Sequence, residues 1–376
     1  MVGNISRLVN VNYSQLLVEI SLRNVALSVI FAKTIVLLKE KPITIIDIAK
    51  QLNISSTTVS FILNGKAKER RISDKVRDKV LKFVTEVGYK PNLLARSFRT
   101  GKTNIIGLMV ENISNPFFAN VARMIEEKAY QNGYKILYCS TENDSTKAKE
   151  LMQMFKDRYV DGYIITPTEG IKNEVDELIN SGAPVILFDR FFEDGNNDYV
   201  ILDNFKSTYT AVEHLVAEGF REIAFVTINS LQSQMQQRLY GYEKAIEDHK
   251  LNHYIKEVDF NLDTDKVSEY IVEFLKRRKQ LDAIIFSTNY LGVAGLKAIK
   301  KLGLKIPGDI AIVSFDDYML FELHTPTITA IAQPIEAMSE QLINVLLDKL
   351  TSANQVHHKV VLPGNLIVRE SSVKSK

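Results

Sequence analysis

The sequence predicts an α/β protein with a small all-α segment near its N-terminus and a much larger core of two lobes, each built on a parallel sheet. Three observations lead to this fold class. Short helical patterns fill the stretch between Thr44 and Lys90. From Asn104 onward, short apolar runs alternate with amphipathic helical stretches. The positive charge of the chain is concentrated in the helical stretch and distinguishes it from the part that begins at Asn104.

Length and composition are those of a globular protein without a disulfide framework. The chain has 376 residues, of which 45% are hydrophobic and 24% charged, and this length suggests two or three domains. Its single cysteine, Cys139, fits a reducing compartment, and we expect it to be a buried small side chain. His249 and His253 have helical spacing, but no Cys or second His pair completes a metal set, so we expect a solvated face there.

The net charge of +2 is unevenly spread. Residues 41–103 hold 14 Lys and Arg against 5 Asp and Glu, whereas residues 104–376 hold 29 against 38. A strongly basic segment joined to an acidic body suggests a polyanion as the partner of that segment. The alternative is a basic surface that serves only solubility.

Residues 1–40 carry no clear fold signal. The apolar stretch Leu16–Leu38 is interrupted by Glu19, Arg23 and Lys33, so it lacks the ~20 apolar residues of a membrane span. It also lacks the basic start and small-residue cleavage site of a signal peptide. We expect a poorly ordered extension, or residues foreign to the natural product, with a weak amphipathic helix as the alternative.

The basic segment predicts three short helices. Thr44 can cap a helix over Ile45–Leu52, with Asp47 completing a capping box, and Ser55 can cap the next helix. A third helix opens at Ile72–Asp74, and the sequence GYKP ends it. Its expected apolar stripe consists of Val76, Val80, Leu81, Phe83 and Val84.

The rest of the chain predicts parallel sheets covered by helices on both faces. The helical stretches include Phe117–Asn132 and Leu291–Leu302. Nearly continuous apolar strands separated by helices are typical of this arrangement, and the length suffices for two lobes. The apolar runs are Ile105–Val110, Ile136–Tyr138, Tyr163–Thr166, Val185–Phe188, Ile223–Ile228, Ile284–Ser287 and Ile310–Ser314.

The second short helix has an unusual outer face. Its inward positions are Val59, Ile62 and Leu63, and its outward positions are Thr57, Ser60, Phe61 and Asn64, with Ser56 at the leading edge. Two helices joined by the tight turn Leu52–Ile54 form a helix-turn-helix arrangement, which presents hydroxyls to base edges in the major groove. The alternative is an ordinary helical pair with a polar surface.

A family resemblance then becomes specific. The stretch ITIIDIAKQLNISSTTVSFILNGK closely resembles the headpiece of the lactose-repressor (LacI/GalR) family of bacterial transcriptional regulators. The resemblance continues through ISDKVRDKVLKFVTEVGYKPNLLARSFRTGKTNIIGLMVENISNPFF and recurs in VDGYIITP, FDR, LDN, RLYGY, LGLKIPGDIAIVSFDD, TPTITAIAQP and VRES. It implies a helix-turn-helix headpiece, a hinge helix and a two-lobed core similar to periplasmic sugar-binding proteins.

The resemblance implies a domain order and a set of DNA contacts. The expected order is an extension at 1–40, a headpiece at 41–91, a hinge helix and linker at 92–103, and an effector-binding core at 104–376. Within the core, the N-lobe would comprise about 104–203 and 333–360, and the C-lobe about 204–332 and 361–376. Ser56 and Thr57 would read bases, while Thr44, Ser55, Ser60 and Asn64 would position the helix on phosphates. The salt-dependent attraction to DNA is expected from five cations: Lys50, Lys66, Lys68, Arg70 and Arg71.

Two positions depart from the family pattern in the DNA-binding part. Phe61 stands where many members have an Arg that reads guanine, so only apolar contact is expected there. Phe98 stands where the family usually inserts a Leu wedge into the minor groove, and Phe can also act as a wedge. Asn92 and Arg96 would contact the backbone or the groove. The operator is therefore expected to differ from that of Arg-bearing members.

The resemblance also implies an effector cleft for a sugar or sugar phosphate. Aromatic faces, carboxylates and an Arg suit a polyhydroxylated ligand, with Gln232 and Gln234 placed to tune that Arg. The expected cleft residues are Phe117, Phe118, Asp189, Asp203, Arg238, Phe260, Asn289, Asp316 and Gln333. Asn289 stands where family members commonly have a carboxylate. If the alignment with the family is shifted by one residue, Tyr290 takes that position instead. A charged or purine-like effector therefore stays open as an alternative to a sugar.

These observations favour a ligand-controlled transcription factor. Most members of the family it resembles repress transcription. We expect a cytoplasmic homodimer on a pseudo-palindromic operator, with no cofactor and no membrane contact, and a tetramer stays open. A secreted sugar-binding protein does not explain the basic segment. An enzyme is disfavoured because the sequence lacks a Walker A motif, G-x-G-x-x-G, a G-x-S-x-G elbow and a metal set.

Overall fold

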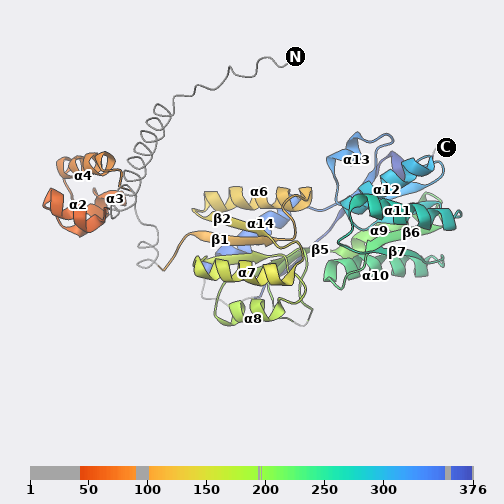
Figure 1. Ribbon diagram of the computed structural model, residues 1–376, viewed down its shortest axis with the longest axis horizontal. Coiled ribbons are helices and arrows are strands. Elements are labelled where there is room, and N and C mark those ends of the chain that lie inside the picture. Colours follow the sequence, from red (N-terminus) through yellow and green to blue (C-terminus); the bar gives the residue numbers. More distant parts are fainter. Residues whose placement is uncertain (1–42, 90–100, 194, 196, 352–356, 375–376) are drawn as a thin grey trace, which may run out of the picture. The chain divides into compact units, whose positions relative to one another are not determined.

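The computed structural model describes residues 43–89, 101–193, 195, 197–351 and 357–374. Contacts divide the chain into two units, residues 1–93 and 94–376. We call the described part of the first unit the headpiece and that of the second unit the core, and describe each by itself (Figure 1). The expectations for residues 1–40 lie outside the described part of the chain.

The headpiece consists of the three predicted helices: α2 (Ile45–Leu52), α3 (Ser56–Leu63) and α4 (Asp74–Glu86). Thr44 and Asp47 form the expected capping box at the start of α2. Asn53 ends α2 in the left-handed region, with φ 52°, and this allows the tight turn into α3. Ser73 stands at the cap position of α4, but its side chain makes no capping hydrogen bond.

A small apolar core holds these helices together. The predicted inward residues Val59 and Ile62 are buried, and Leu63 packs against them. The core also contains Ile48, Ala49, Ala67 and Val80. The prediction for Leu81 is wrong: it is 42% exposed. Leu81 directly follows the buried Val80, so the ~100° step between helix neighbours turns it away from the core.

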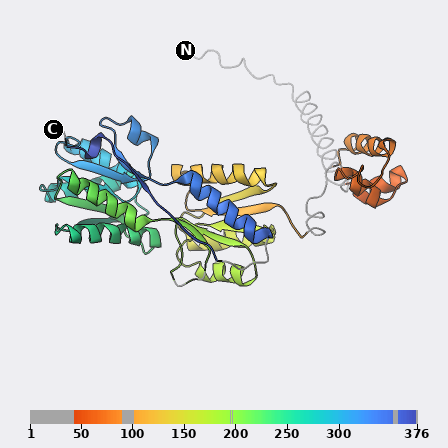
Figure 2. The same ribbon diagram turned by 180° about the vertical axis from the view of Figure 1, so that it is seen from behind.

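The N-lobe of the core is a six-stranded sheet in the order β11-β5-β4-β3-β1-β2. Helices α6 and α14 cover one face and α7 and α8 the other (Figures 1 and 2). Its strands are β1 (Ile105–Val110), β2 (Lys135–Ser140), β3 (Gly162–Ile165), β4 (Val185–Phe188), β5 (Tyr199–Leu202) and β11 (Lys359–Leu362). Its helices are α6 (Pro116–Gln131), α7 (Ser145–Asp157), α8 (Lys172–Asn180) and α14 (Ile335–Thr351).

The C-lobe repeats this layout with the order β12-β10-β9-β8-β6-β7. Helices α9 and α10 pack on one face, and α11, α12 and α13 on the other. Its strands are β6 (Ile223–Ile228), β7 (Tyr254–Val258), β8 (Ala283–Phe286), β9 (Ala311–Phe315), β10 (Thr329–Ala332) and β12 (Asn365–Ile367). Its helices are α9 (Asn204–Ala217), α10 (Ser233–Asp248), α11 (Thr264–Arg277), α12 (Asn289–Leu302), α13 (Met319–Leu323) and a 3-10 turn at Glu370–Ser372.

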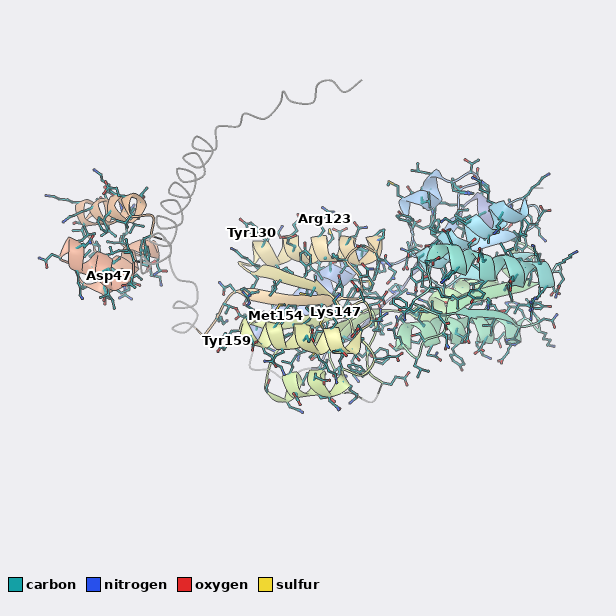
Figure 3. The ribbon with its side chains drawn as sticks, in the orientation of Figure 1. Asp47, Arg123, Tyr130, Lys147, Met154 and Tyr159 are labelled. Atoms are coloured by element: carbon teal, nitrogen blue, oxygen red, sulfur yellow. The ribbon has the colours of Figure 1, made fainter. Side chains whose placement is uncertain are left out.

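The fold class predicted from the sequence is confirmed, with corrections at the sheet edges. All seven predicted apolar runs form strands, but β12 pairs antiparallel with β10. Strand β2 lies at an edge and is only partly covered, since Tyr138 is 49% exposed. Tyr130 of α6 is also 75% exposed (Figure 3). Edge strands are half-solvated, so their sequences lack the continuous apolar run that marks a central strand.

Within the described residues, no helix is long and apolar enough to cross a membrane.

The packing of α10 on α9 depends on a glycine. A Cβ at Gly241 would collide with the backbone carbonyl oxygen of Phe205. We expect Gly241→Ala to destabilise the core by about 1–3 kcal/mol. The reason is that a backbone carbonyl group cannot move aside to relieve the clash, whereas the end of a flexible side chain can. Urea unfolding followed by circular dichroism measures this change. Gly308→Ala is the control, because its nearest atom, Lys305 Cβ, lies at 3.6 Å; equal losses in both variants would contradict the packing argument.

Candidate functional site

Some polar side chains at α3 form hydrogen bonds within the headpiece, whereas others are exposed. Ser55 accepts a hydrogen bond from the Thr58 backbone N–H at 3.0 Å and so caps the helix. Asn64 Nδ2 donates to the Ser60 carbonyl oxygen at 2.6 Å. By contrast, Ser56 and Thr57 are exposed at the start of the helix. The two predicted base readers therefore lie where a major groove could be reached.

The remaining predicted DNA contacts fall into two groups. Thr44 Oγ1 donates to Asp47 Oδ2 at 2.6 Å, and Lys66 is exposed just after α3. The predicted hinge contacts Asn92, Arg96 and Phe98 lie outside the described residues.

Phe61 is half-buried rather than fully outward, and it has a partner. The guanidinium carbon of Arg70 lies 4.7 Å from the centroid of its ring. Arg70 belongs to the loop between α3 and α4 and is exposed. The apolar ring of Phe61 on α3 thus lies under the cation of Arg70.

The core contains a cleft made of three hollows that share lining residues. The outer hollow, of about 510 Å³, and a second of about 380 Å³ both touch Asn289. The inner hollow, of about 30 Å³, shares Glu111 and Tyr290 with the first and Asp316 with the second. The first two volumes lie within the range of small-molecule sites, whereas the inner hollow is almost filled by side chains.

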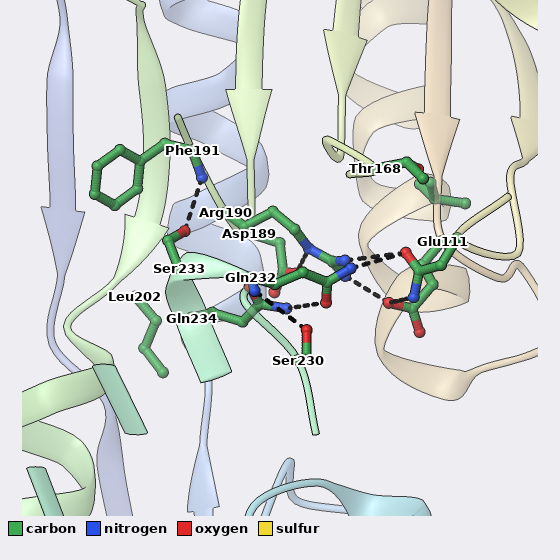
Figure 4. A network of polar contacts seen from close by, with 12 residues as sticks. Glu111, Thr168, Asp189, Arg190, Phe191, Leu202, Ser230, Gln232, Ser233 and Gln234 are labelled. Atoms are coloured by element: carbon green, nitrogen blue, oxygen red, sulfur yellow. Dashed lines mark hydrogen bonds and ion pairs between the residues drawn. The ribbon is translucent and has the colours of Figure 1, made fainter. Parts of the chain in front are cut away.

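A buried charge network fills the inner hollow (Figure 4). Arg190 Nη2 lies 2.6 Å from Glu111 Oε2, and Arg190 Nε lies 3.0 Å from Asp189 Oδ2. Asn143 Oδ1 accepts from Arg190 Nη1 and from Gln232 Nε2, both at 3.1 Å. Because Gln232 precedes α10 of the C-lobe and the others belong to the N-lobe, the network joins the two lobes.

Burial changes the ionisation of Asp189 in this network. It raises the pKa of the Asp189 carboxyl, although the charges of Arg190 and Arg238 act in the opposite direction. Asp189 also has φ 70°, and Asp316 has φ 63°, at the ends of β4 and β9. Left-handed backbone at a residue other than glycine is strained, and such strain gathers at functional sites.

Arg238 of α10 is held rigidly from three sides. Its Nε donates to Asn204 Oδ1 at 2.8 Å, and its Nη1 donates to the Ser287 carbonyl oxygen at 2.6 Å. Its guanidinium also lies over the ring of Phe315, 3.8 Å from the centroid. Burial lowers its pKa, with Asp316 opposing this effect.

Most predicted cleft residues are brought together, but Asp203 is not. Its carboxylate accepts from the Lys206 backbone N–H and caps α9, while the next residue, Asn204, contacts Arg238. Phe117 and Phe118 form a buried wall, with Phe117 stacked on Phe188 at a centroid distance of 5.7 Å. The others also line the hollows: Asp189, Arg238, Phe260, Asn289, Asp316 and Gln333.

Sequence reasoning missed several residues of the cleft and of its charge network. Glu111 and Arg190 each follow a strand end, and this position was the available signal. Asn143 lies in a loop and carries no sequence signal. Tyr290 was considered only under a shifted alignment; it lines both the outer and inner hollows, and burial raises its pKa.

Comparisons with known proteins decide the family. Residues 44–92 match the pattern of the lacI family of bacterial regulatory proteins, and residues 212–372 match a periplasmic binding protein-like domain. The NTD biosynthesis operon regulator NtdR of Bacillus subtilis is 30% identical over 331 residues, which cover 88% of this chain and 99% of NtdR. The chain belongs to the LacI family.

Two further similarities agree with this assignment. The ribose operon repressor of Haemophilus influenzae is 29% identical, over 87% of this chain and 98% of the repressor. A LacI-type regulator from Alkaliphilus metalliredigens QYMF, solved with D-xylulofuranose, is 28% identical with a TM-score of 0.65, over 72% of this chain and 100% of that one. This LacI-family protein is a DNA-binding transcriptional regulator, and its homologues are regulators rather than enzymes.

The ion pair between Glu111 and Arg190 should matter for stability. We expect Glu111→Gln to destabilise the core by about 3–5 kcal/mol, because it leaves part of a buried charge uncompensated. Thermal unfolding measures the loss. The control is Glu142→Gln, which removes the exposed ion pair with Lys147 and should leave the unfolding temperature nearly unchanged. An unchanged unfolding temperature in Glu111→Gln would contradict the stabilising role of the network.

Proposed function

We propose that this LacI-family regulator represses transcription as a homodimer on a pseudo-palindromic operator, and that a small neutral sugar in the interlobe cleft controls its binding. The charge balance of the inner hollow carries the proposal for the ligand. Two arginines, Arg190 and Arg238, face three carboxylates there: Glu111, Asp189 and Asp316. No excess positive charge is left for an anionic ligand.

The headpiece supports the DNA part of the proposal. Ser56 and Thr57 would read bases at the exposed start of α3, and Thr44, Ser55, Ser60, Asn64 and Lys66 would position the helix on phosphates. Each chain carries one headpiece, so two half-sites require two copies, and their symmetry implies a pseudo-palindrome. Because operator DNA lies in the cytoplasm, the protein would act there.

The proposed division of the chain follows from these tasks. The headpiece at 41–91 would bind DNA, the hinge at 92–103 would transmit the state of the core, and the lobes of 104–376 would bind the effector. Within the hinge, Asn92 and Arg96 would contact DNA, and Phe98 would insert as a wedge.

The cleft offers hydrogen-bond acceptors that suit sugar hydroxyls. Among the described residues, Gln234 Oε1 and Gln333 Oε1 are buried without a hydrogen-bond partner, and both residues line the inner hollow. Buried polar atoms need partners, and a hydroxyl can supply the missing donor. Phe117 and Tyr290 supply apolar faces for the C–H side of a sugar ring.

A phosphorylated sugar fits this cleft less well. A phosphate group carries roughly −1.5 to −2 charges at neutral pH. Arg190 is already bonded to two carboxylates, and Arg238 to an amide and a carbonyl oxygen. Burying such an anion without an uncompensated cation is costly. Of the two effector classes expected from the sequence, these contacts favour the neutral sugar.

The lobes are joined by few polar contacts, so a ligand can change their orientation. Besides Gln232 to Asn143, Asn289 Nδ2 donates to Asn115 Oδ1 at 3.2 Å, and the Phe191 N–H donates to Ser233 Oγ at 3.1 Å. A sugar that bonds to both lobes would stabilise one arrangement over another. That differential affinity is the basis of allosteric control of DNA binding.

DNA footprinting of the full chain on its own upstream region, across a salt series and a panel of sugars, tests the function. We expect one protected pseudo-palindrome, a steep loss of affinity with salt, and a shift of that affinity by one sugar. Thr57→Ala should lose the footprint but keep sugar binding, and Asn289→Ala should do the reverse. Protection no stronger than on random DNA would contradict the proposal.

Titration calorimetry tests the ligand class. We expect the effective sugar to bind at least about tenfold more tightly than its phosphate ester, since the ester lacks a compensating cation. The control ligand is a sugar of the same size that does not shift the footprint. Tighter binding of the ester would show that the charge argument is wrong.

A further inference from the structure

Arg70 and Phe61 form a cation–π pair on the surface of the headpiece. The guanidinium carbon lies 4.7 Å from the ring centroid. A guanidinium held over an aromatic face interacts with the ring as a cation, and its N–H groups remain available as hydrogen-bond donors. The ring limits the rotation of a long side chain without using any of its donors.

The loop that carries Arg70 is held in place by its backbone. The Lys66 N–H donates to the Phe61 carbonyl oxygen at 2.9 Å, and the Arg70 N–H donates to the Lys66 carbonyl oxygen at 3.1 Å. Ala67 is buried in the headpiece core, and the Ile72 N–H donates to its carbonyl oxygen at 2.9 Å. Arg70 is therefore presented beside the C-terminal half of α3 by folded structure.

The charge of Arg70 has no acidic partner within the described headpiece. Arg77, by contrast, pairs with Asp74 and Asp78. Both Arg70 and its neighbour Lys68 are exposed. The two cations differ in their surroundings: Arg70 lies over the Phe61 ring, whereas no ring of the described residues lies under Lys68.

We propose that Arg70, oriented by Phe61, reads a guanine in the operator and so determines specificity from outside α3. This inference rests on the proposed entry of α3 into the major groove. Guanine presents N7 and O6 there as a pair of acceptors, and the guanidinium fork matches them with two parallel hydrogen bonds. The contact with Phe61 restricts the position of the guanidinium and leaves its N–H donors available for this pair of hydrogen bonds.

Selection of binding sites from randomised DNA tests this role with the full chain. The unaltered protein should select a guanine at one symmetric position of each half-site. Arg70→Ala should lose that preference and bind the selected site roughly 5- to 150-fold more weakly, with much less change on random DNA. Arg70→Lys should recover affinity but little of the preference, because an ammonium lacks the planar fork.

Two further variants separate stacking from charge. Phe61→Leu keeps an apolar side chain but removes the aromatic face, so it should weaken the same guanine preference. Lys68→Ala is the matched control, and it should lower affinity evenly for all sequences while the guanine preference stays. The slope of the logarithm of the binding constant against the logarithm of the salt concentration should fall in magnitude by about one. Thermal unfolding checks that each headpiece folds.

The outcomes are distinguishable. If Arg70→Ala weakens selected and random DNA equally, Arg70 contacts phosphate, and the proposal is overturned. If the unaltered protein selects no sequence at all, the proposed operator recognition itself fails.

Discussion

The core is organised around one buried cation, Arg190. Only 3% of this residue is exposed, and a charge in that position requires partners. Glu111 and Asp189 supply them from the ends of β1 and β4, which β3 separates in the N-lobe sheet, and Asn143 links them to Gln232 of the C-lobe. The same contacts that stabilise the charge therefore join the two lobes and line the inner hollow of the cleft.

This arrangement follows from the geometry of parallel sheets. The carboxyl ends of the parallel strands of one sheet lie along the same edge, so Glu111 after β1 and Asp189 after β4 meet in the N-lobe although they are far apart in sequence. Asp316, just after β9 of the C-lobe sheet, lines the same inner hollow. Asp189 and Asp316 both accept left-handed backbone at these ends. The chain turns there from strand to loop, and the neighbouring structure holds the strained residue in place.

The headpiece illustrates the opposite case, in which local signals suffice. The capping box at Thr44, the cap at Ser55 and the left-handed Asn53 are each decided within a few residues, and the observed α2 and α3 begin and end where these signals place them. The partnership of Phe61 with Arg70 was not predictable in this way, because it joins a helix to a loop nine residues later.

The sequence by itself determined the fold class, the central strands and the headpiece helices, because hydrophobic periodicity and capping are local. The family motifs, which are ordered along the chain, also pointed to eight residues that line the hollows. Only the tertiary structure decided that Asn204, and not Asp203, contacts Arg238, that Leu81 is exposed, and that Glu111 shares Arg190 with Asp189. Each of these depends on which side chain faces which across distant segments. A change of one residue along a helix or strand end reverses that outcome, and no local pattern records it.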